Sequence, residues 1–173
     1  GTSADAFAVG ARTFVPREGG GTYGLFYAGS TSAESATSSA WVYALRQDAR
    51  TRSNLAVANR GDAGPITLRA TWYSSIGTVL GSVEKTLEPG EWYQFGQPLA
   101  AFGALDGFAH VERISGASRF VAYGVLNDNV TSDAIAVLAD RAPPAGAQEL
   151  LLAGAAKSPG LAGTYFSTDA RVF

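Results

Sequence analysis

Hydrophobic and polar residues alternate along this chain in short runs, and the clearest run lies within residues 50–62. Leu55 and Val57 alternate there with small residues, a period of two that predicts a strand with one buried face. The turn-forming sequence Asn59-Arg60-Gly61-Asp62 follows it, and a second alternating run extends over residues 66–73. Two alternating runs on either side of a turn predict a β-hairpin.

The same alternation recurs through most of the chain, while the helical period is nearly absent. Strands are predicted at 5–15, 21–28, 41–46, 52–59, 66–74, 79–87, 91–95, 107–114, 119–126, 134–139, 150–152 and 164–173, with one helical turn within 98–104. Short strands at near-regular spacing predict an all-β fold, an Ig-like antiparallel β-sandwich. The residues predicted to lie in its core are Leu55, Val57, Leu68, Val111 and Val121.

Two pairs of segments resemble each other at nearly the same spacing. The segment Phe7-Ala8-Val9-Gly10 resembles Val121-Ala122-Tyr123-Gly124, 114 positions further on (124 − 10). Residues 167–172 resemble residues 52–57, with a spacing of 115 (169 − 54). The shared spacing indicates a repeat, of which the chain holds one complete unit and parts of two others. The alternative is that any two strands rich in Ala and Val look alike.

The repeat predicts four regions in the chain. Residues 1–30 would supply end strands of a preceding unit, 31–140 a complete sandwich, 141–147 a linker rich in Pro and Ala, and 148–173 opening strands of a following unit. The terminal strands would then belong to a second, split repeat. They would either pair within one chain or complete a sheet of the next subunit. The residues predicted to form these partner strands are Asp5, Phe7, Val9, Thr13, Tyr165, Asp169 and Val172.

Three motifs in the central region carry a resemblance to a known kind of domain. They are the Arg-x-Asn-Leu strand ending in Gly-Asp at 52–62, the Leu-x-Pro-Gly turn at 87–90, and the strand ending in Asp-Asn at 120–129. In these the chain resembles a β-sandwich repeat of large secreted or cell-surface bacterial proteins, over about residues 41–140. The resemblance implies an extracellular or cell-surface location and a structural or adhesive role without catalysis.

Composition narrows the class of function. Hydrophobic residues make up 46% of the 173 positions, enough for a core. A net charge of −2 excludes a nucleic-acid module that works by neutralising phosphates. The chain has no Cys, so disulfides, thiolate catalysis and Cys-based zinc sites are excluded. No apolar run is long enough to span a bilayer, so membrane insertion is not expected.

The most polar stretch, residues 127–133, is the candidate metal site. Asp128, Asn129 and Asp133 carry oxygen ligands, but the Gly and the distal Glu of a calcium loop are missing. We therefore expect no metal and no cofactor here, and a turn in which these side chains cap backbone amides. Asn129-Val130-Thr131 also matches the glycosylation sequon, a pattern common by chance.

Catalytic chemistry has few candidates. His110 is the single histidine, and the nucleophile elbow that a serine triad needs is missing. Glycosidases use carboxylate pairs, but the candidate carboxylates are at ordinary solvent-facing positions of strands or turns: Glu84, Glu88, Glu91 and Glu112. The integrin-like tripeptide Arg60-Gly61-Asp62 is interpreted as a turn. We therefore expect no enzyme.

Aromatic residues support a second hypothesis. Neighbouring strand residues face opposite sides, so some of Trp41, Trp72, Tyr73, Trp92 and Tyr93 must point outward and could stack on a sugar. The sequence thus predicts a non-catalytic extracellular module that associates with itself or with neighbouring repeats, by head-to-tail strand complementation. The alternative is a carbohydrate-binding accessory module of a secreted hydrolase, whose partner would be a glycan.

Overall fold

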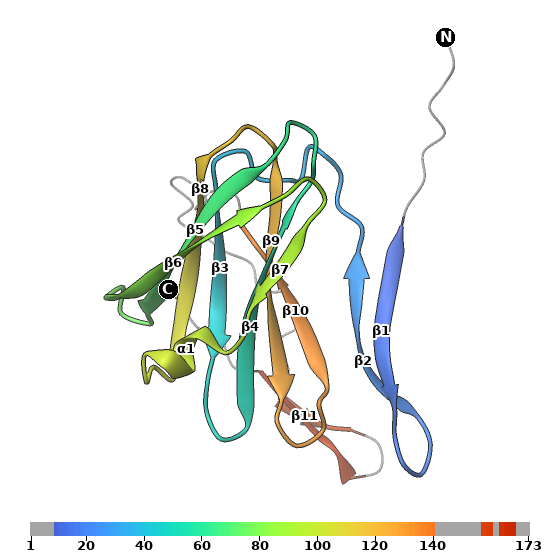
Figure 1. The fold of residues 1–173 in the computed structure, drawn as a ribbon. Coiled ribbons are helices and arrows are strands. Elements are labelled where there is room, and N and C mark those ends of the chain that lie inside the picture. Colours follow the sequence, from blue (N-terminus) through green and yellow to red (C-terminus); the bar gives the residue numbers. More distant parts are fainter. Residues whose placement is uncertain (1–8, 141–156, 161–162, 169–173) are drawn as a thin grey trace.

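The computed structural model describes residues 9–140, 157–160 and 163–168. It confirms the all-β prediction: two four-stranded antiparallel sheets pack against each other as a sandwich (Figure 1). One sheet has the order β10-β9-β4-β7 and the other β3-β8-β5-β6. The bounds are β3 (Ser39–Arg46), β4 (Thr51–Asn59), β5 (Ile66–Ser74), β6 (Val79–Leu87), β7 (Trp92–Phe95), β8 (Asp106–Ser115), β9 (Phe120–Asp128) and β10 (Ala134–Leu138). The predicted helical turn is α1 (Pro98–Ala101).

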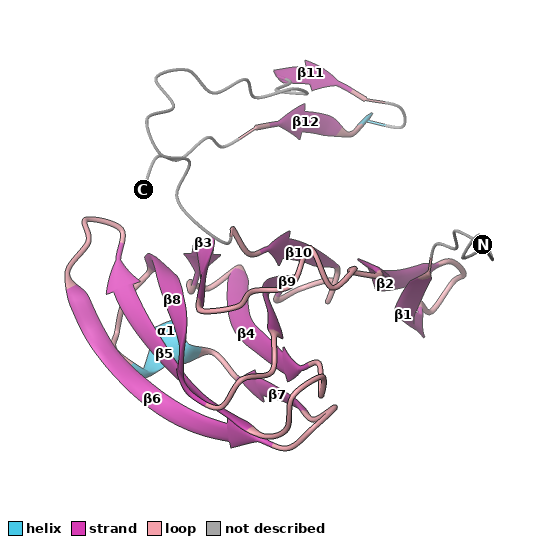
Figure 2. Cartoon of the chain, turned by 90° about the horizontal axis from the view of Figure 1, so that it is seen from above, coloured by secondary structure: helices cyan, strands magenta, loops and turns pink. Residues whose placement is uncertain are grey.

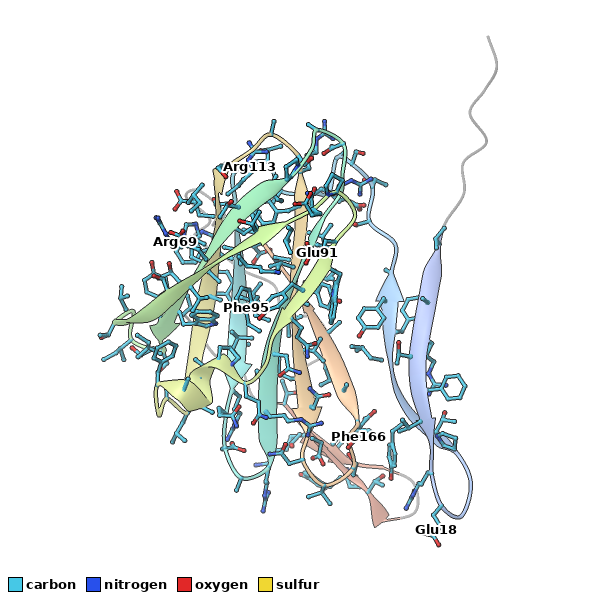
Figure 3. The ribbon with its side chains drawn as sticks, in the orientation of Figure 1. Glu18, Arg69, Glu91, Phe95, Arg113 and Phe166 are labelled. Carbon is cyan, nitrogen blue, oxygen red and sulfur yellow. The ribbon has the colours of Figure 1, made fainter. Side chains whose placement is uncertain are left out.

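Alternating side chains of both sheets fill the interior of the sandwich. Leu55, Val57, Leu68 and Val111 are fully buried there, as predicted. Other members of this core are Val42, Leu45, Ile66, Trp72, Leu87, Phe95, Leu99 and Phe120. Figure 3 shows Phe95 between the two sheets.

The prediction for Val121 is wrong, because this residue is only half-buried. Its neighbours Phe120 and Ala122 face the core instead, which shifts the buried phase of β9 by one position. A one-residue change of phase moves every side chain of a strand to the other face. The large ring of Phe120 takes the interior position, since burying it removes more apolar surface from water than burying Val121 would.

The predicted hairpin of β4 and β5 is also wrong. β4 pairs with β7 and β9, whereas β5 pairs with β6 and β8, so the connection crosses from one sheet to the other. The buried Asn59 amide holds this crossing, because its Nδ2 donates to the carbonyls of Gly64 (3.0 Å) and Leu87 (3.1 Å). Its Oδ1 accepts a hydrogen bond from the Gly61 amide at 2.8 Å. Both strands therefore alternate because each directs every second side chain into the same interior, β4 from one sheet and β5 from the other.

The second predicted hairpin, β5 with β6, is confirmed by an antiparallel register of eight residue pairs. Gly77 closes its turn with a φ of 84°, a backbone conformation that glycine adopts without steric cost.

A separate hairpin precedes the sandwich. Its strands are β1 (Gly10–Pro16) and β2 (Thr22–Ala28), which pair only with each other among the residues described. Figures 1 and 2 both show β2 on the side of β10 and β1 further out. Leu25 of β2 is buried, and the ring of Tyr27 meets that of Tyr123 edge-on at 5.7 Å. All seven residues of β1 are exposed.

A short two-stranded ribbon follows the sandwich. β11 (Lys157–Pro159) and β12 (Tyr165–Ser167) pair antiparallel, and Figure 2 shows them apart from both four-stranded sheets. The predicted linker at 141–147 and the predicted strand at 150–152 lie outside the described residues. So do residues 5–8 and 169–173 of the predicted terminal strands, including Asp5, Phe7, Asp169 and Val172.

Candidate functional site

Five rings gather on the outer face of the sheet β3-β8-β5-β6. Trp41 of β3 stacks on His110 of β8, with ring centroids 4.2 Å apart. Tyr73 of β5 lies parallel to Phe108 of β8 at 5.0 Å, and Trp41 touches both of these rings at 5.9 Å. Tyr43 completes the group, 6.2 Å from Trp41. We call these five residues the aromatic face.

A row of charges lies beside the aromatic face. Arg69 of β5 donates two hydrogen bonds to Glu84 of β6, at 2.8 and 3.1 Å, and is 3.9 Å from Glu112 of β8. Register places the three on adjacent strands, because Arg69 is paired with both glutamates. Figure 3 shows Arg69 on the side of the sandwich away from the hairpin β1–β2. Two of the carboxylates considered for glycosidase chemistry thus flank a cation.

The other two carboxylates lie at the turn between β6 and β7. Glu91 accepts a hydrogen bond from the Glu88 amide at 2.8 Å and is 3.3 Å from the Lys85 ammonium. These contacts, the Glu88 amide foremost, lower the pKa of the Glu91 carboxyl. An acid catalyst needs a raised pKa, so this environment suits a turn cap.

The rings singled out in the sequence do not share one face. Trp72 is buried in the core, where its ring meets Phe95 edge-on at 5.4 Å. Trp92 and Tyr93 are exposed on β7 in the other sheet, and the Trp92 indole donates to the Tyr123 hydroxyl at 2.9 Å. Trp41 and Tyr73 alone come together. Phe108 and His110 join them because β8 lies between β3 and β5, a strand order that alternation does not reveal, and Tyr43 lies two residues after Trp41 on β3.

His110 has the one imidazole in this sequence. Burial between β3 and β5 lowers its pKa, and the nearby Glu112 carboxylate opposes that shift in part. The ring is therefore held mainly in its neutral form, stacked on Trp41.

The candidate metal loop is a capped turn. Asp128 Oδ1 accepts hydrogen bonds from the Val130 amide (2.8 Å), the Thr131 amide (2.7 Å) and the Thr131 hydroxyl (3.1 Å). These donors, the Thr131 amide first, lower the Asp128 pKa. The Asp133 amide donates a hydrogen bond to the Thr131 hydroxyl oxygen at 3.1 Å. Asp128 Oδ1, which was considered as a calcium ligand, thus already accepts hydrogen bonds from donors of its own loop.

Asn129 joins this loop to the turn before β4. Its Nδ2 donates to the carbonyls of Asp48 (3.2 Å) and Ala49 (3.3 Å), and its Oδ1 accepts from Arg52 at 2.9 Å. We call this the Asn129 clasp. Glycosylation at Asn129 stays a prediction, and a sugar on Nδ2 would compete with both carbonyl contacts.

The Arg60-Gly61-Asp62 tripeptide is bound within the fold. Arg60 donates to the Ser30 carbonyl (3.1 Å) and to the Ser35 hydroxyl (3.2 Å). Asp62 accepts from the Arg119 amide at 2.9 Å, which is the main cause of its lowered pKa. These contacts fit the interpretation of the tripeptide as a structural turn.

The Ser- and Thr-rich loop between β2 and β3 is held by the same two arginines. Arg119 donates to the Ser32 carbonyl at 3.1 Å, beside a pocket of about 380 Å³. The pocket is lined by Ser32, Ala33, Ser35, Thr37, Ser38, Ser39 and Arg119. Most of these residues are polar, and the same loop is tied to β9 by an isolated bridge between Ala36 and Phe120.

The described residues contain neither a cluster of metal-ligating side chains nor a membrane-spanning helix. Within 9–140, 157–160 and 163–168, no three residues among His, Cys, Asp and Glu come together as a metal site would need. The same residues include no helix with the length and apolar character to cross a bilayer.

The terminal strands form the last candidate site. The predicted partner residues Val9, Thr13 and Tyr165 are exposed, on or next to β1 and β12. Other large side chains of β1, β2 and β12 are exposed as well: Phe14 is 55% exposed, Val15 53%, Phe26 61% and Phe166 60%, and Tyr165 itself is 58% exposed. Exposed aromatic residues in this number mark an interaction surface more often than a free one.

The repeat stays a prediction, and its spacings relate these terminal strands to strands of the sandwich by position alone. Gly10, the first residue of β1, corresponds after a shift of 114 positions to Gly124 in β9. β1 and β9 are each the first strand of an antiparallel hairpin. When 115 is subtracted from their residue numbers, β11 corresponds to residues within β3 and β12 to residues at the start of β4.

No protein-family model, no curated protein and no solved structure matches this chain.

Proposed function

We propose that this protein is a non-catalytic structural module that joins copies of itself head to tail through its terminal strands. The observation that carries the proposal is the exposed strand β1, which corresponds in the repeat to the paired strand β9. In the sandwich, β9 pairs with β10 on one edge and with β4 on the other. β1 pairs with β2 on one edge, and among the described residues no strand lies against its other edge.

An open strand edge presents amides and carbonyls that recruit another strand. The strand equivalent to β4 is β12, at the other end of the described chain. A contact between β12 of one copy and β1 of another uses two different surfaces. It therefore does not close by two-fold symmetry, and repetition builds a filament or an array.

An extracellular or cell-surface location is part of the proposal. Its support is the resemblance to repeats of secreted bacterial proteins and the absence of Cys from the sequence. The hydrogen bonds within the Asp128 loop and around Arg69 support a structural role over catalysis, because the candidate acidic groups there are engaged.

Light scattering tests the association. The average mass of the full chain should rise with concentration, while a variant ending at residue 156 should keep its β-type circular dichroism and remain monomeric. A full chain that is strictly monomeric at high concentration would falsify the proposed function. A matched chain with the exposed Ile76→Ser change, in the β5–β6 turn, should polymerise as the parent does.

Carbohydrate binding at the aromatic face is the second candidate. Four partly exposed rings, Trp41, Tyr43, Tyr73 and His110, lie on this face over the buried Phe108 and beside Arg69 and Glu112, so part of their surface and hydrogen-bonding groups lie together. Retention on insoluble polysaccharides, lost in Trp41→Ala and kept in Trp92→Ala, would support it. Equal retention of both variants would exclude the aromatic face as the binding surface.

A further inference from the structure

The polar pocket beside the loop between β2 and β3 combines hydroxyl groups with one positive charge. We propose that this pocket binds a saccharide that carries a carboxylate, with the acid group on the Arg119 guanidinium and the sugar hydroxyls on the Ser and Thr side chains. The pocket shares no lining residue with the aromatic face. The inference goes beyond self-association of the chain and does not depend on it.

The loop that forms the pocket is bonded to both sheets. Ala36 exchanges two backbone hydrogen bonds with Phe120 of β9, at 2.8 and 3.0 Å. The Arg113 amide of β8, a strand of the other sheet, donates to the Ser38 carbonyl at 2.8 Å. Ala36 is buried as well. These bonds hold the wall of the pocket in place before a ligand arrives, which lowers the entropy cost of binding.

Four hydroxyl groups of the lining are free to meet a ligand. They belong to Ser32, Thr37, Ser38 and Ser39, whose hydroxyls have no hydrogen-bond partner among the residues that the structure describes. A hydroxyl both donates and accepts, so it can pair with a sugar hydroxyl in either sense. The pocket volume of about 380 Å³ lies near the lower end of the roughly 300–1,000 Å³ found for small-molecule sites. It therefore suits a small polar ligand.

Positive charge is concentrated at this end of the sandwich. Arg119 lines the pocket, Arg60 donates to the hydroxyl of its lining residue Ser35 at 3.2 Å, and Figure 3 shows Arg113 near the end of β8. Arg60 and Arg113 also donate to backbone carbonyls, and neither makes an ion pair with a described residue. Asp62, 3.7 Å from Arg119 Nε, is the one described carboxylate paired with any of the three. The excess of positive charge attracts an anion.

Two other carboxylates near the pocket are bonded elsewhere. Glu34 accepts a hydrogen bond from the Thr31 amide at 2.6 Å. Glu112 is opposite Ser39 in the register of β3 and β8, but its carboxylate is 3.9 Å from the Arg69 guanidinium. Neither glutamate lines the pocket, so Arg119 is the one charged group of the lining.

The Arg119 guanidinium keeps part of its hydrogen-bonding capacity for a ligand. Nη1 donates to the Ser32 carbonyl at 3.1 Å and Nε faces Asp62, whereas Nη2 makes no hydrogen bond to a described residue. The planar arrangement of guanidinium donors matches the two oxygens of a carboxylate. No aromatic side chain lines the pocket, so the acid group and the hydroxyls would have to supply the affinity.

Saturation-transfer NMR on the full chain tests the assignment, because it detects the signals of the ligand and works for a monomer as well as for an assembly. The probes are methyl β-D-glucuronide and methyl β-D-glucoside, which differ in the carboxylate. We expect saturation of the glucuronide alone. Arg119→Gln removes the charge of the pocket and should abolish this signal, while Arg69→Gln, beside the aromatic face, should keep it.

A second variant keeps the test decisive if Arg119→Gln fails to fold without its contacts to Ser32 and Asp62. Thr37→Val removes one exposed hydroxyl of the pocket at nearly constant shape, and should weaken glucuronide binding about fivefold, the usual loss for one hydrogen bond. Ser82→Ala, at an exposed position of β6, is the matched control and should bind as the parent does. Circular dichroism and melting temperature report the folding of each variant.

Other results would overturn the inference. Equal saturation of both probes, or glucuronide binding that survives Arg119→Gln in a folded protein, would mean that Arg119 does not select the acid group. Loss of the signal in Arg69→Gln alone would place the sugar on the aromatic face. Complete displacement of the glucuronide by an equal concentration of inorganic sulfate would mean a simple anion site and reject the saccharide. None of these results alters the rise of mass with concentration that tests the proposed function.

Discussion

The sandwich and the hairpin β1–β2 are built from the same kind of strand, but the sandwich buries its large apolar side chains and the hairpin exposes most of them. In the sandwich, both sheets direct residues such as Leu55 and Leu68 into one interior, where they are fully buried. The hairpin also alternates, yet Leu25 alone of its residues is buried, and Phe14 and Phe26 are more than half exposed. The comparison shows that alternation predicts a strand but does not say what covers it.

The largest effect is expected in the sandwich core. Leu68→Ala removes most of a fully buried side chain and should lower the free energy of unfolding by about 2–5 kcal/mol. Urea denaturation followed by tryptophan fluorescence measures it. Leu138→Ala, at an exposed position of β10, is the matched control and should change the free energy by less than about 0.5 kcal/mol.

A smaller effect is expected where the two sheets are tied together. Asn59→Ala removes the side-chain donor to the Leu87 carbonyl, whereas the Gly64 carbonyl keeps the Ser118 hydroxyl as a donor at 2.7 Å. Unsatisfied buried polar groups cost about 1–3 kcal/mol, so the same measurement should show a loss of that size. Asn54→Ala, which removes the Gln97 amide contact at 3.0 Å on the exposed side of β4, should cost less. Equal losses would show that Asn59 has no special part in the crossing.

The pH dependence of stability should distinguish the aromatic face from the rest of the sandwich. The pKa of His110 lies below its unfolded value of 6.5, because burial disfavours the charged ring, although Glu112 opposes this. The unfolded chain therefore binds more protons, and stability should fall as pH drops from about 6.5 toward the folded pKa. The charged group that acts on the ring is Glu112, whose carboxylate is itself 3.9 Å from the Arg69 guanidinium.

His110→Gln should flatten the stability curve between pH 7 and 5, because the carboxyl groups with lowered pKa values (Asp48, Asp62, Glu91 and Asp128) titrate at more acid pH. Melting temperatures across this range, compared with the parent, provide the measurement. An unchanged slope in the variant would place the pH dependence elsewhere.

The smallest effect on stability is expected in the hairpin. Phe26→Ala should change the free energy of unfolding of the monomer by less than about 0.5 kcal/mol, since its side chain is largely in water. Phe120→Ala, the same change in the core, should cost about 3–5 kcal/mol. If both substitutions destabilise the chain equally, the hairpin has more packing than its exposure indicates, and the contrast between the two regions fails.

Alternation was enough to predict the strands of the sandwich, because a period of two is a local property. The errors concern partners that are distant in sequence. β4 and β5 were expected to pair as neighbours, but Asn59 directs them into different sheets. The buried phase of β9 was shifted because Val121 and Phe120 both suit a strand, and the space in the core decides between them.

The candidate sites show the same limit. The capped turn at Asp128 was predicted from the spacing of its own residues, and its hydrogen bonds fit that prediction. The aromatic face was predicted only in part, since Trp41 meets His110 and Tyr73 through a strand order set by long-range pairing. Cross-strand neighbours of this kind have no signal in a single sequence.

The distance along the chain between β4 and β9 has a consequence for the kinetics of folding. Thr51 pairs with Asp128, 77 positions away (128 − 51). β4 leaves the ribosome before β9, and the entropy cost of closing a loop rises with its length. The edge of β4 that β9 covers in the sandwich is therefore without its partner until most of the domain has been synthesised. The Asn129 clasp, whose Nδ2 contacts Asp48 and Ala49, forms only when β9 is complete and joins the end of β9 to the turn before β4.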